Sequence, residues 1–424
     1  MHNASEGLNP TAQKHYRRNF AMGVVNAAAF QVAETMIDSS LVLTWFLSQL
    51  TTSNLLIGLP APIRNAGWFL PQLLVSGYVQ RQERKLRLYQ IFAVVRVVSF
   101  ALLTAATWLW GVRRPQWLLA AFFILLTVFS LSEGISGISF LDVVAKCIPA
   151  RRRGSYFAYR NLVGGILALG SSGAVRYILG ESSGLTFPAN FGLLFVGALV
   201  GITIGVLAFS LVIEPLEPTN PQAVSLWQQL RRAWGFARAD RRYARLIVVR
   251  IALLLAGGLA TPFYIVYAKN VLGATAGSVG TFLLVLTLAA IGSNLFWGRL
   301  CDRRGNRAVI LFSCVIGICV PLTVMLAGYM RSLPLLFLPV ALQGIYQSSI
   351  MVGQVNFVLE IAPPAERPTY LGLINTVLGV ATFTLAVGGL IVDLAGYHAL
   401  FLLAALFFVP AFWLTWGLKD PRAG

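Results

Sequence analysis

Long apolar runs separated by short polar intervals recur along the whole chain. Each run is long enough for a helix to cross the hydrocarbon core of a bilayer, which needs about 20 residues. Because lipid offers no hydrogen bonds to a peptide group, each run is predicted to be a helix that satisfies its own backbone. We count about twelve such runs, over residues 19–49, 55–79, 87–110, 116–145, 154–179, 190–213, 245–270, 277–300, 307–330, 334–361, 368–394 and 397–418. The pattern predicts an all-α integral membrane protein with about 12 transmembrane helices.

The composition fits a surface that faces lipid. Of the 424 residues, 57% are hydrophobic and 11% are charged, whereas a soluble domain carries roughly 25% charged residues. The net charge of +18 would suggest a nucleic-acid partner in a soluble protein. If the N-terminus lies inside, about 24 of the 33 Lys and Arg residues fall on the inner side and five on the outer side. This asymmetry predicts cytoplasmic termini, a plasma (inner) membrane location and contact with anionic lipid, with no nucleic acid as partner.

The longest polar interval divides the runs into two sets of six. It contains the basic stretch VSLWQQLRRAWGFAR, whose apolar residues recur at helical spacing, so a helix lying on the inner membrane surface is predicted there. We therefore expect an N-terminal six-helix half over 1–213, a cytoplasmic linker with an amphipathic basic helix over 214–244, and a C-terminal six-helix half over 245–424.

The two halves also repeat each other in sequence. A shift of 214 residues lays IPARRRGSYFAYRNLVGG over APPAERPTYLGLINTVLGV, so that Tyr156 meets Tyr370. A shift of 221 residues brings Gly77 onto Gly298. Six helices return the chain to the side where it began, so the two repeats have the same orientation. Parallel repeats of this kind are one transporter architecture, with a binding site near the bilayer midplane between the halves.

The stretch FWGRLCDRRGNRAVILF places several charged residues between two apolar runs. Its Gly298, Asp302, Arg303, Gly305 and Arg307 match the pattern glycine-x-x-x-aspartate-(Arg)-x-glycine-(Arg/Lys). This stretch resembles the loop signature of the major facilitator superfamily, between the second and third helices of a half. The resemblance implies that family's fold over nearly the whole chain, with helices 1, 4, 7 and 10 of the twelve lining a central cavity.

The chemistry of this loop suggests a latch on the cytoplasmic side. Gly298 would let two helices approach closely, and Gly305 would allow a tight reversal. Asp302 would accept hydrogen bonds from a neighbouring helix N-terminus and pair with Arg303 or Arg307. Such contacts would hold the outward-facing state; the alternative is a short basic loop that only sets topology. The first-half copy, GYVQRQERKLR, has arginine where the aspartate is expected, so the first half is expected to latch differently.

Ionisable residues at bilayer depth are expensive and mark function by default. The first run holds Glu34 and Asp38, which on one helix would lie on the same face about 6 Å apart. Two carboxylates this close in a low dielectric do not easily both stay ionised, which favours a site that binds and releases a proton. Two alternatives stay open, a site for a cationic group or substrate and a structural pair with Arg64 of the second helix. Glu133 in the fourth run is a further candidate.

The resemblance also implies which polar and aromatic residues line the cavity. They lie on helices 1, 7 and 10 and are Asn26, Gln31, Tyr264, Tyr267, Gln343, Tyr346, Gln347 and Gln354. The cavity would then be acidic in the first half and neutral and aromatic in the second, which suits flat or cationic ligands. Each aromatic residue could instead belong to an interfacial belt. Asp142 and Arg160 are expected to form a structural pair between helices 4 and 5.

These features predict a secondary transporter that moves a small amphipathic organic solute across the inner membrane by alternating access, with proton-coupled export favoured. A proton-coupled importer, a facilitator and a lipid or lysolipid flippase are alternatives, and a non-transporting receptor or scaffold is the rival from another class. We see no phosphate-binding loop and no His/Cys ligand spacing in the sequence. We therefore expect no cofactor, no metal and no enzyme activity, and a monomer whose partners are a small-molecule substrate, protons and membrane lipid.

Overall fold

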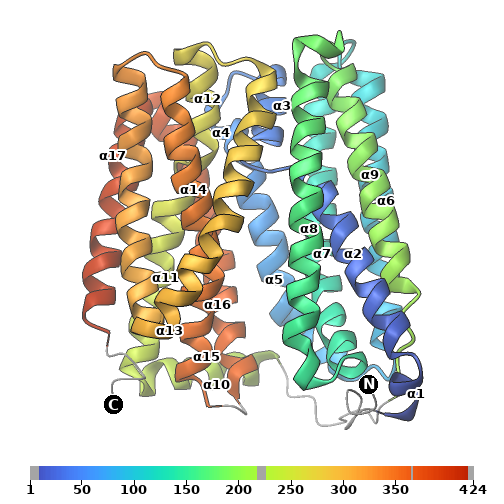
Figure 1. The fold of residues 1–424 in the computed structure, drawn as a ribbon. Helices are drawn as coiled ribbons and strands as arrows, with labels where there is room; N and C mark the ends of the chain where they lie inside the picture. The colour runs from blue at the N-terminus through green and yellow to red at the C-terminus, as the bar shows by residue number, and fades with distance from the viewer. Residues whose placement is uncertain (1–8, 217–225, 364–365, 419–424) are drawn as a thin grey trace. The chain divides into compact units, whose positions relative to one another are not determined.

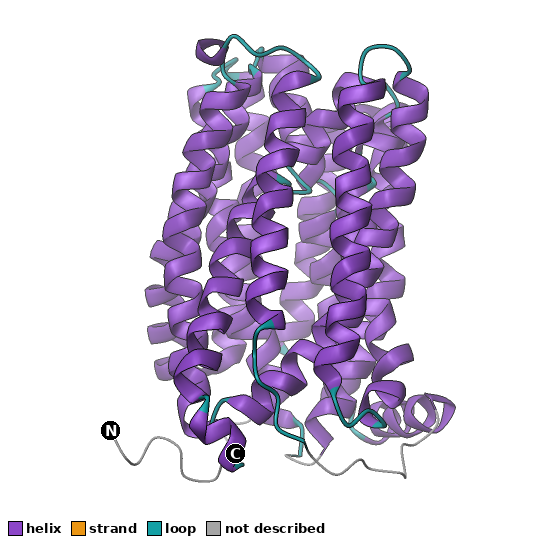
Figure 2. Ribbon diagram, turned by 90° about the vertical axis from the view of Figure 1, so that its right-hand side faces the viewer, coloured by secondary structure: helices purple, strands orange, loops and turns teal. Residues whose placement is uncertain are grey.

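The computed structural model describes residues 9–216, 226–363 and 366–418, and every regular element within these ranges is a helix (Figure 2). By their contacts the residues fall into two compact units. The first unit combines Met1–Asp38 with Gly67–Leu226, and the second combines Ser39–Ala66 with Trp227–Gly424. The all-α prediction is confirmed.

The first unit is built from long helices that pack side by side (Figure 1). Its elements are α1 (Pro10–Lys14), α2 (Tyr16–Met36), most of α5 (Pro60–Gln80), α6 (Lys85–Trp110), α7 (Pro115–Cys147), α8 (Ala150–Leu179), η2 (Glu181–Ser183) and α9 (Ala189–Ser210). Helix α2 packs against both α8 and α9, and α6 packs against α7 and α9. Small residues permit this closeness: a Cβ added to Gly201 would come 2.8 Å from the carbonyl oxygen of Ala29.

The second unit contains most of α10 and all later elements, together with α3, α4 and the first turns of α5. Its further elements are α3 (Val42–Leu50), α4 (Asn54–Ile57), α10 (Leu226–Ala239), α11 (Arg241–Gly258), α12 (Thr261–Leu272), α13 (Ala276–Tyr329), η3 (Pro334–Leu336), α14 (Phe337–Ser349), the π-helical η4 (Ile350–Val355), α15 (Asn356–Ile361), α16 (Arg367–Ala381), η6 (Thr382–Ala386) and α17 (Val387–Trp416). The described part of the predicted linker is therefore helical over α10, while residues 217–225 lie outside the described ranges.

Eight of the described helices are long and apolar enough to span a membrane. Two of them exceed a single span, with 54 residues in Ala276–Tyr329 and 48 residues in Thr369–Trp416. Each is interrupted at a glycine with positive φ, 76° at Gly305 and 79° at Gly396, so each supplies two spans. If α2–α3 and α5 are counted as one span each, the helices agree with the prediction of about twelve spans.

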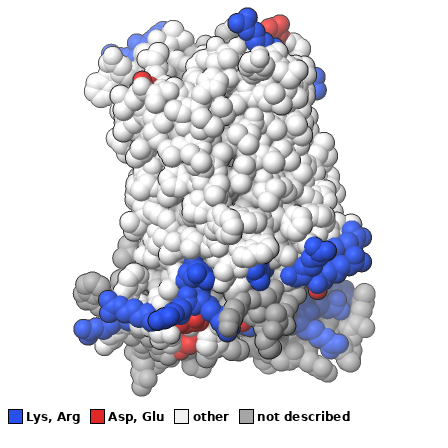
Figure 3. Space-filling view, turned by 90° about the vertical axis from the view of Figure 1, so that its left-hand side faces the viewer, with Lys and Arg blue, Asp and Glu red and all other residues white. Residues whose placement is uncertain are grey.

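The side chains on the outer faces show what surrounds the helices. On α6, Ile91, Val94, Val98 and Leu102 are 50 to 60% exposed, whereas Arg96 is 5% exposed. Exposed apolar side chains together with a buried charged side chain are typical of a helix that faces lipid. On the face shown in Figure 3, Lys and Arg gather near one end, and a broad band of the surface carries no charge.

The first apolar run is not one helix. Helix α2 ends at Met36, and the chain makes turns before α3 begins at Val42. The side chains of Asp38, Ser39 and Ser40 compete with helical hydrogen bonding, and the hydroxyl of Thr44 donates to the Ser39 carbonyl oxygen at 3.0 Å. The predicted continuous helix over 19–49 is therefore wrong, and Glu34 and Asp38 do not share a helical face.

A second break lies at the corresponding place in the other half. Helix α11 ends at Gly258 and α12 begins at Thr261, after two consecutive glycines that weaken a helix. The offset of 221 residues between Gly77 and Gly298 carries Asp38 onto Leu259. Helices interrupted at corresponding positions of two repeats are typical of transporters.

Residues 39–66 belong to the second unit because of specific contacts. Helix α3 packs on α12 and α4 packs on α17. The ammonium of Lys269 donates to the backbone and side-chain oxygens of Ser48 at 3.1 and 2.8 Å, and the amide of Asn54 donates to Asp393 at 2.7 Å. Gly389 lies so close to this segment that an added Cβ would come 2.5 Å from the carbonyl carbon of Asn54. The boundary that we predict near residue 213 stays a prediction.

The loop within α13 differs in part from the predicted latch. A Cβ added to Gly298 would meet no atom within 4 Å, so the close helix approach expected there is not found. Asp302 and Arg303 are exposed, and within the described ranges Asp302 makes no hydrogen bond or ion pair. Arg307 instead donates to the carbonyl oxygen of Trp416 at the end of α17. The latch itself stays a prediction.

Gly305 has φ 76° and ψ 171°, a conformation that is essentially restricted to glycine. Gly305→Ala is expected to lower the free energy of unfolding by about 1–3 kcal/mol. Gly298→Ala is the matched control, because the site has space and helical backbone, and it should change stability by less than about 1 kcal/mol or increase it. Thermal unfolding of both purified variants measures the difference, and equal values for the two would contradict the role of Gly305.

Candidate functional site

A cavity of about 190 Å³ lies wholly within the first unit. It is lined from five helices by polar, charged and aromatic residues, namely Asn26, Phe30 and Glu34 of α2, Trp68 of α5, Tyr89 and Arg96 of α6, Glu133, Ser136, Gly137 and Phe140 of α7, and Arg160 of α8. The combination of a mostly apolar wall with a few convergent polar groups is typical of a small-molecule site.

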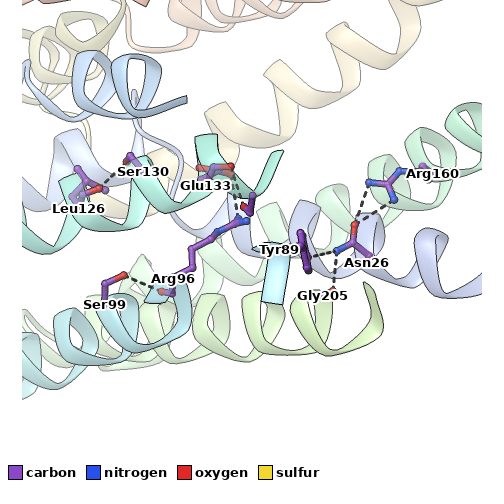
Figure 4. A network of polar contacts seen from close by, with 10 residues as sticks. Asn26, Tyr89, Arg96, Ser99, Leu126, Ser130, Glu133, Arg160 and Gly205 are labelled. Carbon is purple, nitrogen blue, oxygen red and sulfur yellow. Dashed lines mark hydrogen bonds and ion pairs between the residues drawn. The ribbon is translucent and has the colours of Figure 1, made fainter. Parts of the chain in front are cut away.

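An ion pair between Arg96 and Glu133 lies on this cavity (Figure 4). The Arg96 Nη2 lies 3.2 Å from Glu133 Oε1, and the two side chains are 6% and 15% exposed. The guanidinium carbon lies 4.3 Å from the Phe30 ring centroid and 5.2 Å from that of Phe129. Among the described residues, the buried Nε of Arg96 has no hydrogen-bond partner. A buried arginine is thus held by aromatic faces and one carboxylate.

A second polar network connects four helices through Asn26 (Figure 4). Arg160 donates to the Gly23 carbonyl oxygen, and both its terminal nitrogens lie 3.3 Å from Asn26 Oδ1. The Asn26 amide donates to the Gly205 carbonyl oxygen at 2.8 Å and to the Tyr89 hydroxyl at 3.4 Å. Asn26 therefore satisfies its polar atoms and fixes the guanidinium of Arg160 on the cavity wall.

Glycines let α5 approach α7 at the cavity. A Cβ on Gly134 would overlap the carbonyl oxygen of Gly67, so the two backbones touch there. A Cβ on Gly137 would come 2.9 Å from the ring of Trp68. The sequence LSEGISGISF on α7 thereby makes room for Trp68, which lines the same cavity as Glu133.

Two sequence expectations about charged residues need correction. Asp142 does not pair with Arg160, because Asp142 lies 2.8 Å from the ammonium of Lys85 at the start of α6, while Arg160 is bound to Asn26. The first-half cavity is also not acidic, because two arginines accompany Glu34 and Glu133 in its lining. Arg96 is a cavity residue that the sequence-based site candidates do not include, although a single charge inside an apolar run must face protein or snorkel.

The other candidates of the first two predicted helices lie in different environments. Glu34 is half-buried and lines the cavity. Asp38 lies in the turns beyond α2, and Gln31 is exposed. Arg64 lies on the part of α5 that belongs to the second unit. Of this group the structure brings only Glu34 and Asn26 into the cavity of the first unit.

In the second unit, the predicted cavity tyrosines pack inside the unit. Tyr267 is 1% exposed with its ring 5.3 Å from Phe401, and Tyr264 contacts the same ring at 5.2 Å. Tyr346 is 3% exposed and donates to the Leu253 carbonyl oxygen at 3.2 Å. The rings of Tyr267 and Tyr346 are thus buried within the unit, and the central-cavity role expected for the three tyrosines stays a prediction.

The three glutamines of this group differ from one another. Gln343 is buried and donates to the Thr261 hydroxyl at 3.2 Å, next to the break between α11 and α12. Gln354 is buried within the π-helical turn η4, and Gln347 is exposed. Their role in a central cavity stays a prediction.

Comparison with known proteins identifies the family. The sequence model described as "Major Facilitator Superfamily" matches residues 23–331 and 246–424. The chain belongs to the Major Facilitator Superfamily. Its apolar helices and this membership make it an integral membrane protein with the transporter fold of that family.

Solved structures of the superfamily share this fold. A D-xylose–proton symporter aligns with a TM-score of 0.68 and 13% identity over 96% of this chain and 98% of that chain. A mutant of the nucleoside transporter NupG aligns with a TM-score of 0.69 and 16% identity over 96% and 100%. The human organic anion transporter MFSD10 aligns with a TM-score of 0.66 and 16% identity over 94% and 99%. At these identities the likeness establishes the fold alone.

Curated relatives come from mycobacteria. Uncharacterized protein Rv2209 of Mycobacterium tuberculosis and Uncharacterized protein Mb2232 of Mycobacterium bovis are each 22% identical over 269 residues, which is 61% of this chain and 50% of the relative. The chain thus spans about half the length of the curated relatives it matches.

Proposed function

We propose that this member of the Major Facilitator Superfamily is a secondary transporter that moves a small amphipathic organic solute by alternating access, coupled to protons. The supporting observation is the cavity of the first unit, which puts the carboxylates Glu34 and Glu133 beside two guanidinium groups within apolar helices. The proposal includes a plasma (inner) membrane location, cytoplasmic termini and a monomer, in line with the distribution of basic residues along the sequence.

The cavity offers a way to link solute affinity to pH. Two carboxylates and two guanidinium groups balance in charge, and one proton on either carboxylate changes the net charge by one unit. Affinity for a solute then depends on protonation, and by linkage the solute also changes proton affinity. A preference for export would follow from an acidic cavity; because this cavity is charge-balanced, the proposal covers proton-coupled export and import alike.

The aromatic lining suits the organic part of the solute. Phe30, Trp68, Tyr89 and Phe140 are the aromatic residues in the lining of the cavity. Such surfaces bury apolar groups without requiring hydrogen bonds, while the charged groups fix orientation. The cavity therefore supports a solute with both a polar and an apolar part.

Glu34→Gln is expected to abolish proton-driven accumulation of the solute while binding stays measurable, because the amide keeps the side-chain shape but cannot exchange a proton. The assay uses proteoliposomes loaded with the pH-sensitive dye pyranine and an imposed pH gradient. Glu181→Gln, at an exposed position of η2, is the control and should behave as the unmodified chain. Proton-driven transport at the normal rate in Glu34→Gln would exclude Glu34 from coupling.

The transporter proposal itself is tested in two steps. Thermal unfolding across a panel of sugars, nucleosides, dipeptides, organic acids and lysolipids identifies ligands, since a bound ligand raises the melting temperature by mass action. Counterflow in sealed vesicles then asks whether labelled ligand exchanges with unlabelled ligand. A ligand that binds but never exchanges would support a receptor or scaffold instead and would overturn the proposal.

A further inference from the structure

A basic cleft lies at the start of α11 in the second unit. Its volume is about 630 Å³, and the described residues that line it are Arg241, Arg242 and Arg245 of α11 and Gly417 and Leu418 at the end of α17. No acidic residue is among these described lining residues. A hollow lined by three cations and no anion concentrates positive potential and favours a negatively charged ligand.

The three guanidinium groups keep donors that a ligand can use. Arg241 and Arg242 are exposed, and within the described ranges their side chains make no hydrogen bond or ion pair. Arg245 donates Nη1 to the Gly417 carbonyl oxygen at 2.5 Å, which occupies one of its five N–H donors. The acid next to them in the sequence is Asp240, whose carboxylate accepts a hydrogen bond from the backbone N–H of Arg242 at 2.8 Å. Three positive charges thus lie beside one negative charge.

The spacing of the arginines brings them to one ligand. Arg241 and Arg245 are four positions apart and Arg242 and Arg245 are three apart, and side chains at these spacings are neighbours on a helix surface. Like charges at such spacings repel one another, and an anion between them relieves the repulsion. Guanidinium groups bind phosphate through pairs of parallel N–H bonds. The arrangement therefore suits a phosphate group.

The neighbouring side chains place the cleft at the level of lipid head groups. The apolar stretch Arg241–Leu272 begins at these arginines, and the apolar stretch Thr369–Trp416 ends beside them. In the last turn of α17, Trp413 and Trp416 are 66% and 57% exposed, and exposed tryptophans are typical of the membrane–water interface. Further along α11, Val248 is 50% exposed. A phosphate in the cleft therefore has apolar surface within reach of an attached acyl chain.

We propose that this cleft binds the phosphate group of an anionic phospholipid from the cytoplasmic leaflet. Arg241, Arg242 and the remaining donors of Arg245 bind the phosphate, and the acyl chains lie along the exposed apolar side chains of α11 and α17. A volume of about 630 Å³ corresponds to roughly 20 water molecules at about 30 Å³ each, which is room for a phosphate and its glycerol. The site belongs to the second unit, and it does not depend on the proposed transport function.

The test uses ligands that separate net charge, acyl chains and phosphate. The melting temperature of the full chain in the neutral detergent dodecyl maltoside is measured with dioctanoyl phosphatidylglycerol, dioctanoyl phosphatidic acid, dioctanoyl phosphatidylcholine and glycerol 3-phosphate. The two anionic lipids should raise the melting temperature. Phosphatidylcholine has the same chains but no net charge and should raise it less. Glycerol 3-phosphate lacks the chains and should have no comparable effect at the same concentration.

Two double variants that remove the same charge locate the site. Arg241→Gln with Arg242→Gln should weaken binding of phosphatidylglycerol about 10- to 100-fold, the loss expected for charge-assisted contacts. Arg299→Gln with Arg304→Gln, at exposed positions of α13, is the matched control and should retain the affinity. Since all four side chains are exposed, both variants should fold. Arg245 is left in place because it also binds the end of α17.

Four results would overturn the inference. Equal stabilisation by phosphatidylcholine and the anionic lipids, or an equal loss of affinity in both double variants, would reduce the effect to unspecific attraction. Stabilisation by glycerol 3-phosphate as strong as that by the lipids would assign the cleft to a soluble phosphate compound. A chain shortened after Leu418 tests the remaining occupant. Stabilisation by anionic lipid in the shortened chain alone would assign the cleft to residues 419–424.

Discussion

Replacing Glu214 with alanine is expected to lower the free energy of unfolding by about 3–5 kcal/mol, the loss seen when one partner of a buried ion pair is removed. The Glu214 carboxylate lies 2.9 Å from the Lys146 ammonium, and the two side chains are 3% and 5% exposed. Without Glu214 the ammonium keeps the Glu83 carbonyl oxygen, 3.4 Å away, but loses this carboxylate within a buried site.

The same carboxylate also caps a helix. It accepts hydrogen bonds from the backbone N–H groups of Lys85 at 3.1 Å and Leu86 at 2.8 Å, at the start of α6. These donors have no partner inside the helix, and a negative charge there interacts favourably with the helix dipole. The loop of the first half has arginine where the aspartate of the family pattern is expected. The helix that follows this loop, α6, is capped by Glu214, which lies 129 positions beyond Lys85 in the chain.

Asp142→Asn is the matched control for Glu214→Ala. Asp142 pairs with Lys85 at 2.8 Å but its side chain is 37% exposed, so its loss should change stability by no more than about 1 kcal/mol. The double variant Glu214→Gln with Lys146→Met removes both charges and should recover most of the stability. Unfolding in detergent measures all three. Equal losses for the Glu214 and Asp142 variants would refute the buried pair as a major stabilising contact.

Gly389→Ala is expected to abolish transport. The added methyl group would come within 2.5 Å of the Asn54 carbonyl carbon and the Leu55 Cα. Backbone atoms cannot relieve such an overlap by changing rotamer, as a side chain can. The segment Ser39–Ala66 would have to leave α17, which breaks the bond from Asn54 to Asp393. Any state of the transport cycle that needs this packing would then be lost.

Two measurements check the Gly389 prediction. Counterflow reports transport, and maleimide labelling of Leu55→Cys reports whether α4 still packs on α17. Gly292→Ala is the control, since a Cβ there meets no atom within 4 Å, and it should leave both measurements unchanged. Normal flux and normal labelling in Gly389→Ala would show that the segment tolerates displacement.

The helical architecture could be predicted because lipid imposes it. A peptide group in hydrocarbon must bond within its own helix, so the length and apolarity of a run nearly suffice to predict a span. The breaks in the first and seventh helices escaped this reasoning. They depend on a few residues, Asp38 to Ser40 and the pair Gly257 and Gly258, whose local effect disappears when hydropathy is averaged over a whole run.

The site was harder to predict because the relative depth and rotation of neighbouring helices decide which polar side chains meet. Glu34 and Asn26 could be found as polar residues in an apolar run. Arg96 and Glu133 lie 37 positions apart on two helices whose relative depth the sequence does not reveal. The same uncertainty led to the expected pair of Asp142 with Arg160, two residues that the structure gives to different neighbours.

The packing of Ser39–Ala66 has a consequence for folding while the chain is being synthesised. Asn54 and Asp393 are 339 positions apart, and at about 5–20 residues per second the ribosome adds that length in roughly 20–70 seconds. For this period the segment has been made but its neighbour α17 is missing. The nascent chain therefore exposes the packing surface of this segment through most of translation. One of the earliest segments to be synthesised is thus among the last to reach its native packing.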